Sequence, residues 1–160
     1  MLTTNLCADN DDNDDNDDNV KITMKTIRKF LDRLPAWTLT IVCFLAICWL
    51  TLAPHPLPDN DIPLFPGADK IVHAIMFGGF TLCIILDWNR RHGWPADIGK
   101  GDWYAPDFAS AFGIVTEILQ KEMHAGRSGD VWDLVADVTG AFLVCGGWCI
   151  FKLKQQQKQK

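Results

Sequence analysis

Acidic side chains and a histidine recur at helical spacing in three separate parts of the chain. Within each part the spacing is three or four residues, as for Asp69 and His73, so each set is expected on one face of a helix. Carboxylates beside a histidine can transfer protons, hold a metal ion or bind amines and sugar hydroxyls, and Lys and Arg suit anionic groups. The candidate ligand-binding residues are Asp69, Lys70, His73, Glu117, Gln120, Arg127, Asp130, Asp133 and Asp137.

Four apolar blocks carry or flank these residues. They cover residues 36–53, 71–88, 105–120 and 131–151. Each is close to the roughly 20 residues that a helix needs to cross the hydrocarbon core of a bilayer. The expected fold is therefore all-α, a bundle of four transmembrane helices.

The first and third blocks each have an alternative interpretation. The first has no charged residue, and a cleaved signal peptide would look similar, but no small-residue cleavage site follows it. The third is short and contains Asp107 and Glu117, so it could instead be a buried helix of a globular protein. Within the four-span interpretation we expect Asp107 to cap the start of the third helix.

The distribution of basic residues predicts the topology. With four spans and a cytoplasmic N-terminus, twelve of the fifteen Lys and Arg residues fall on the cytoplasmic side. This asymmetry is typical of membrane proteins, so both termini are predicted to be cytoplasmic. Only Lys70, Lys121 and Arg127 are predicted on the exterior side, and Lys70 is expected to extend toward the interface.

This topology brings the candidate residues to one end of the bundle. We expect an outward-facing polar pocket between the second, third and fourth helices. Small residues would permit close helix approach there; they are Gly78, Gly79, Gly113, Gly140 and Ala141. The alternative is that the polar residues only hold the helices together, with Arg127 pairing Asp130 or Asp133 and His73 bonded to Glu117.

The ends of the chain differ from the apolar part. Residues 1–23 form an acidic tract whose Asp/Asn repeat at 9–19 has no apolar residue to bury, which predicts disorder. Met24 would be an ordinary start for a membrane protein. Residues 24–35 are a basic cytoplasmic flank, 36–151 the membrane domain, and 152–160 a basic, Gln-rich cytoplasmic tail. Residues 89–104 are expected to be a polar connector.

Cysteine usage indicates no cofactor. Five of the six cysteines lie inside the apolar blocks, where a thiol behaves as a small hydrophobe. The chain contains no CxxC motif, so no structural metal site and no disulfide framework are predicted. We therefore expect no cofactor and no resident metal.

The ordered motifs resemble the VanZ-like family of bacterial membrane proteins. The matching segments are TLAPHPLP at 51–58, DKIVHAIMFGGF at 69–80, EILQ at 117–120 and GRSGDVWDLVADVTGA at 126–141. The resemblance implies a multi-pass protein of the bacterial cytoplasmic membrane. It also implies a link to glycopeptide (teicoplanin) resistance, known for the member that named the family, but no settled biochemical activity. The family usually has asparagine where this chain has Asp137, so the pairing or ligand preference of the pocket is expected to differ.

Four classes of function are compatible with the sequence. The preferred hypothesis is a non-enzymatic envelope protein whose pocket binds a lipid headgroup, a glycolipid or a lipid-linked cell-wall component. The alternative is a membrane-embedded hydrolase or transferase, with His73, Glu117, Asp133 and Asp137 holding a metal or acting as acid and base. An ion path and a scaffold subunit are further alternatives. The expected partners are membrane lipids and a lipid-linked cell-wall component or glycopeptide, not nucleic acid.

Overall fold

The computed structural model describes residues 22–23, 25–52, 67–95, 97–123 and 131–157, and these residues form helices without a strand. The predicted all-α class is confirmed. The chain divides into two compact units, Met1–Pro35 and Ala36–Lys160. In the first unit, residues 25–31 are helical. The second contains α2 (Thr38–Leu52), α3 (Ala68–Arg91), α4 (Lys100–Met123) and α5 (Val131–Gln157).

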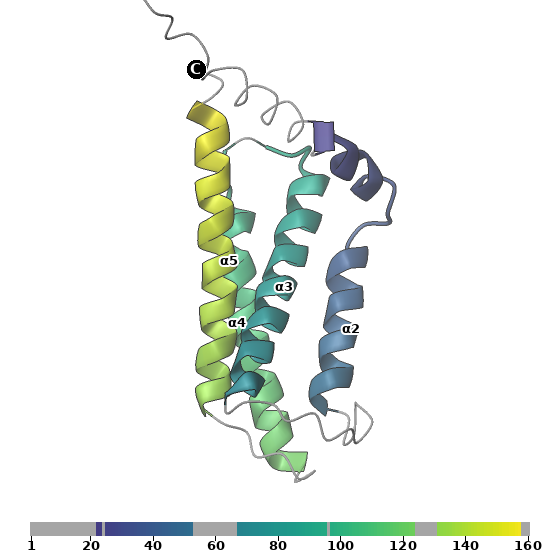
Figure 1. Ribbon diagram of the computed structural model, residues 1–160. Coiled ribbons are helices and arrows are strands. Elements are labelled where there is room, and N and C mark those ends of the chain that lie inside the picture. Colours follow the sequence, from purple (N-terminus) through teal and green to yellow (C-terminus); the bar gives the residue numbers. More distant parts are fainter. Residues whose placement is uncertain (1–21, 24, 53–66, 96, 124–130, 158–160) are drawn as a thin grey trace, which may run out of the picture. The chain divides into compact units, whose positions relative to one another are not determined.

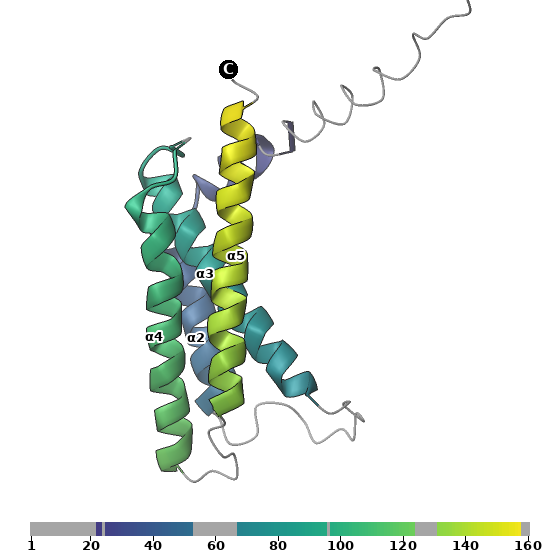
Figure 2. The ribbon, with the colours of Figure 1, turned by 90° about the vertical axis from the view of Figure 1, so that its left-hand side faces the viewer.

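Helices α2 to α5 alternate in direction. Figures 1 and 2 show that α2 and α4 run one way and α3 and α5 the other, with α3 next to each of the other three helices. The starts of α3 and α5 therefore lie at the same end of the bundle as the ends of α2 and α4. We call this the cluster end, because it carries Asp69, His73 and Asp133, and the other the opposite end.

The core is built from aliphatic and aromatic side chains of all four helices. The ring of Phe112 of α4 packs at a tilt against Phe77 and Phe80 of α3, with ring centroids 5.9 and 5.5 Å apart, and against Phe44 of α2 at 4.7 Å. Phe77 and Phe80 are fully buried. Aromatic contacts of this geometry add to the free energy gained by removing the rings from solvent.

Helices α3 and α5 approach closely at small residues. A methyl group added to Gly140 would clash with the backbone of Ala74, and one added to Gly78 would lie 3.1 Å from the carbonyl oxygen of Gly140. The predicted role of these two glycines in close packing therefore agrees with the structure. The same prediction was wrong for Gly79, because a methyl group there would meet no atom within 4 Å.

Two of the described helices, α3 and α5, are long and apolar enough to cross a membrane. Helix α2 is apolar but has only 15 residues, fewer than the predicted block of 36–53. Helix α4 begins earlier and ends later than the predicted 105–120, so Asp107 lies within it and does not cap its start. Helix α5 continues to Gln157, so most of the predicted tail at 152–160 is helical.

A buried polar network occupies the opposite end, where the sequence predicted a plain connector. Lys152 of α5 donates to Asp102 Oδ2 at 2.8 Å, to Asn89 Oδ1 at 2.7 Å and to the carbonyl oxygen of Asp97 at 3.0 Å. Asp102 Oδ1 accepts from Asn89 and from Trp148 Nε1. Asn89, Asp102 and Lys152, which we call the opposite-end network, therefore join α3, α4 and α5.

A second contact between α4 and α5 lies at the opposite end of the bundle and involves Pro106 and Cys145. Pro106 lies inside α4 and has no N–H, so the carbonyl oxygen of Asp102, four residues earlier, lacks its usual helical donor. The thiol of Cys145 on α5 donates to that oxygen at 3.2 Å. A side chain of one helix thus partly replaces a backbone bond that proline removes from another.

Asp87 and Arg90, both on α3, form an ion pair at 2.7 Å. The other oxygen of Asp87 accepts from the backbone N–H and the hydroxyl of Thr40, both at 2.9 Å. Thr40 lies in the first turn of α2, where amides have no partner within their own helix. Asp87 of α3 therefore caps α2 from a neighbouring helix.

Candidate functional site

The candidate site lies between the starts of α3 and α5 and the last part of α4. Gly67, with φ at 91°, sets the direction in which α3 begins, and Asp69 lies in its first turn. Asp133 occupies the first turn of α5. The positive end of a helix dipole stabilises a carboxylate at such positions.

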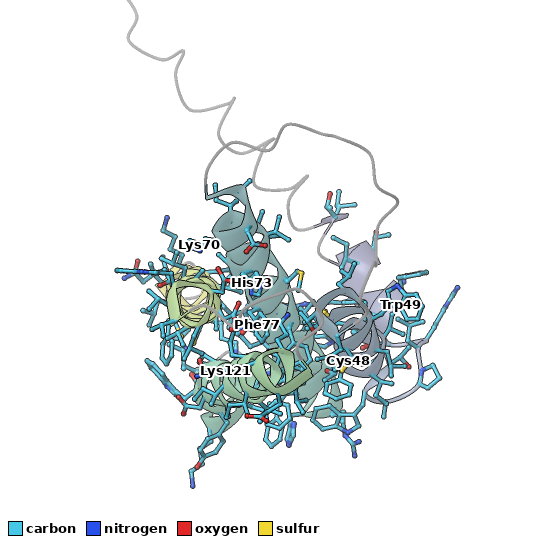
Figure 3. All side chains as sticks on the ribbon, turned by 90° about the horizontal axis from the view of Figure 1, so that it is seen from below. Cys48, Trp49, Lys70, His73, Phe77 and Lys121 are labelled. Atoms are coloured by element: carbon cyan, nitrogen blue, oxygen red, sulfur yellow. The ribbon has the colours of Figure 1, made fainter. Side chains whose placement is uncertain are left out.

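At the cluster end, two pairs of described side chains join α3 to α5. Lys70 Nζ donates to Asp133 Oδ1 at 3.0 Å, and His73 Nδ1 is 3.0 Å from Asp137 Oδ1. His73 and Phe77 lie among α3, α4 and α5 in the view from the cluster end, whereas Trp49 points away from the bundle (Figure 3). Lys70, which was expected to extend toward the interface, pairs with a largely buried carboxylate and keeps 38% of its side chain exposed.

The acidic side chains and His73 form two sets that could each hold a metal ion. The first set is Asp69, His73 and Asp133, and the second is His73, Glu117 and Asp137. Within each set one ligand atom per residue lies within 4.8 Å of the others. We call the five residues together the polar cluster. Helical spacing predicted each face of this cluster, and antiparallel packing brings the faces together.

Asp137 has the most unusual environment in the cluster. Its side chain is fully buried, and among the described residues its Oδ2 accepts no hydrogen bond. Gly113 of α4 faces this oxygen, and a methyl group added there would lie 3.0 Å from it. A buried carboxylate oxygen without a donor costs free energy, so such an atom in a folded protein calls for an explanation.

The charge of the cluster is negative. It contains four carboxylates, and the described residues supply two possible cations, the adjoining Lys70 and, when protonated, His73 of the cluster itself. Lys70 is already paired with Asp133 at 3.0 Å. The arrangement therefore favours a ligand that brings positive charge or hydrogen-bond donors, such as a metal ion, an amine or a sugar hydroxyl.

Four of the predicted site residues are not members of the polar cluster. One is Lys70, which adjoins the cluster through its pair with Asp133. Gln120 donates from Nε2 to the carbonyl oxygen of Thr51 at 2.8 Å, so it satisfies a carbonyl in the last turn of α2. Arg127 and Asp130 lie outside the residues that the structure describes. The predicted Arg127 pairs with Asp130 or Asp133 stay predictions for the same reason.

An apolar groove adjoins the cluster along α3 and α5. Its volume is about 670 Å³, and Lys70 lines it together with Ala74, Gly78, Gly79 and Thr139, among others. The small residues on α3 and α5 are the signal that could have indicated the groove. Gly79 of α3 and Thr139 of α5 both line it. From the sequence, the glycines were predicted only to permit close packing, and the groove was not predicted.

The chain was compared with protein families, curated proteins and solved structures. No family model, no curated protein and no solved structure matches it. The resemblance of its motifs to the VanZ-like family therefore stays a prediction.

Proposed function

We propose that this chain is a multi-pass protein of the bacterial cytoplasmic membrane, of the VanZ-like type, that binds a lipid or lipid-linked cell-wall component. The polar cluster would bind the headgroup at the exterior face, and the groove along α3 and α5 would hold an acyl chain. The observation that carries this proposal is that Lys70 connects the two features: it pairs with Asp133 of the cluster and lines the apolar groove.

The exposed surface of the bundle supports a membrane location. Only 28% of the most apolar stretch of α5, and 44% of that of α3, is buried within the protein. Large apolar side chains are exposed on each of the four helices; they include Val42, Trp49, Ile75, Phe108, Ile118 and Leu143. A soluble protein rarely exposes so much apolar surface, and lipid would cover it. Four spans would then require α2 and α4 to cross beside α3 and α5.

The charge of the cluster limits the class of headgroup. Because Lys70 is engaged by Asp133, the described residues supply carboxylates rather than free cations. Carboxylates accept hydrogen bonds from amines and sugar hydroxyls. A headgroup rich in those donors, such as an amino sugar or an ethanolamine, therefore suits the cluster better than the anionic group that Lys70 and Arg127 suggested from the sequence.

Photo-crosslinking with lipids that carry a diazirine in the acyl chain tests the proposal. Gly79→Leu should fill the groove and reduce labelling of the purified protein by roughly tenfold, since a blocked apolar pocket loses most of its ligand contact. Gly146→Leu is the matched control, because Gly146 is also a helical glycine where an added methyl group would meet no atom within 4 Å. It should be labelled like the wild type.

The headgroup is tested separately, with phosphatidylethanolamine and phosphatidylglycerol probes of the same acyl chain. We expect the amine-bearing probe to label more strongly, and Asp69→Asn with Asp133→Asn to remove that difference. In cells, teicoplanin sensitivity should change with Gly79→Leu and not with Gly146→Leu. Equal labelling of both glycine variants would remove the support for a lipid in the groove.

A further inference from the structure

The more deeply buried half of the polar cluster has the composition of a metal site. His73, Glu117 and Asp137 come from three different helices, and one ligand atom of each lies within 4.8 Å of the other two. Bonds from Zn²⁺ to nitrogen and oxygen are about 2.0–2.2 Å long, so ligand atoms around it are about 3.4 Å apart. Small rotations of the three side chains would give that spacing.

Asp137 Oδ2 is a second, independent observation that points to a bound cation. This oxygen is buried, accepts no hydrogen bond among the described residues, and faces the space beside Gly113. Its other oxygen, Oδ1, lies 3.0 Å from His73 Nδ1. A cation bound at the free oxygen would compensate the cost of burying this carboxylate.

The charge in this half of the cluster also fits a divalent ion. Two carboxylates, those of Glu117 and Asp137, lie beside one imidazole, so a divalent cation would neutralise them when His73 is neutral. Asp69 and Asp133 form the competing set with His73, but Asp69 is exposed and Asp133 is already paired with Lys70. The set that contains Glu117 and Asp137 is therefore the better candidate.

We infer that His73, Glu117 and Asp137 bind a divalent transition-metal ion, with Zn²⁺ the best match to one imidazole and two carboxylates. Imidazole favours zinc over magnesium or calcium, and three protein ligands leave a coordination position open, as in catalytic rather than structural zinc sites. The inference goes beyond the proposed function, because metal binding does not require the lipid. It also departs from the expectation that the chain has no resident metal.

The test is metal analysis of the detergent-purified full chain, first dialysed against a chelator and then reloaded with Zn²⁺ or Mn²⁺. The wild type should retain about one Zn²⁺ per chain after removal of excess metal. His73→Asn and Asp137→Asn should bind more than roughly 100-fold more weakly, since even outer-shell partners of metal ligands cost about 10–100-fold. Asp107→Asn, an exposed carboxylate on the same helix as Glu117, should bind like the wild type.

A spectroscopic measurement keeps the inference testable if a ligand variant fails to fold. Co²⁺ added to the wild type should give visible absorption bands that Zn²⁺ removes by competition. Gly113→Ala keeps all three ligands but places a methyl group beside Asp137 Oδ2, and should weaken these bands. Folded wild-type protein that takes up no Zn²⁺, Mn²⁺ or Co²⁺ would overturn the inference, as would equal binding by wild type and Asp137→Asn.

Discussion

Asp102 at the opposite end of the bundle and Asp137 in the polar cluster are both buried carboxylates on helices, with exposed fractions of 1% and 0%. Their partners differ. The two oxygens of Asp102 accept from Asn89, Trp148, Lys152 and the backbone N–H of Gly99. Asp137 has one partner, His73, on Oδ1, and its Oδ2 has none among the described residues.

This difference separates a structural network from a candidate site. Asp102 is saturated, and its lysine counter-ion comes from another helix, so it can only hold α3, α4 and α5 together. The polar cluster has more acceptors than donors, and a folded protein tolerates that where something else binds. Burial and charge alone would not have distinguished the two ends.

The largest expected effect is on the opposite-end network. Asp102→Asn removes the counter-ion of Lys152, whose ammonium group would remain buried at that site. We expect the free energy of unfolding to fall by about 3–5 kcal/mol, the usual cost of breaking a buried ion pair. Thermal unfolding of purified protein measures it, with Asp107→Asn as the exposed control. A melting temperature equal to that of the control would contradict the structural role.

A smaller effect is expected at Gln120, which the sequence placed in the site and the structure places against α2. Gln120→Met removes the hydrogen bond to the carbonyl oxygen of Thr51 and should lower the free energy of unfolding by about 1 kcal/mol. Lipid labelling and metal binding should not change. Loss of either, with stability unchanged, would return Gln120 to the site.

The link between Pro106 and Cys145 predicts a coupling that a double-mutant cycle can measure. Pro106→Ala restores a backbone donor to the carbonyl oxygen of Asp102, so the thiol of Cys145 is no longer needed there. Cys145→Ala should therefore destabilise the wild type by about 0.5 kcal/mol more than it destabilises the Pro106→Ala variant. Additive changes in unfolding free energy would show that the thiol does not replace the missing bond.

The smallest stability effect is expected for Asp137→Asn, although it is the same substitution as at Asp102. The amide keeps an oxygen for His73, removes a buried charge, and can donate to the nearby carboxylate of Glu117. In the presence of chelator we expect the free energy of unfolding to change by less than about 0.5 kcal/mol. A loss as large as that of Asp102→Asn would mean that Asp137 is structural, and the contrast between the two ends would fail.

Part of this protein could be predicted residue by residue. Apolar blocks close to the length of a membrane-spanning helix predicted an all-α chain. Spacings of four residues placed Asp133 with Asp137, and Asp69 with His73, on common helix faces. The prediction that these residues lie at the same end of the bundle followed from helices that alternate in direction. These inferences succeed because helical periodicity is a local property of the backbone.

Other features could not be predicted from the sequence, because they depend on contacts between helices and not on the local backbone. Asn89, Asp102 and Lys152 lie far apart in the chain and show no periodic pattern, so their network could not be seen before α3, α4 and α5 were packed. Likewise, the spacing of Gln120 fitted the site, but its side chain reaches Thr51 instead. Gly79 and Gly140 are both glycines on packed helices, and only one of them is in close contact.

The sequence by itself determined the helices, their apolar surfaces and the residue types available for a site, because these depend on composition and on spacing along one backbone. Only the tertiary structure decided which carboxylates are satisfied and which are not. Hydrogen bonds between helices depend on rotation and depth to within about 1 Å, and no pattern within one helix fixes either quantity. That is why Asp102 and Asp137, indistinguishable in type, have different roles.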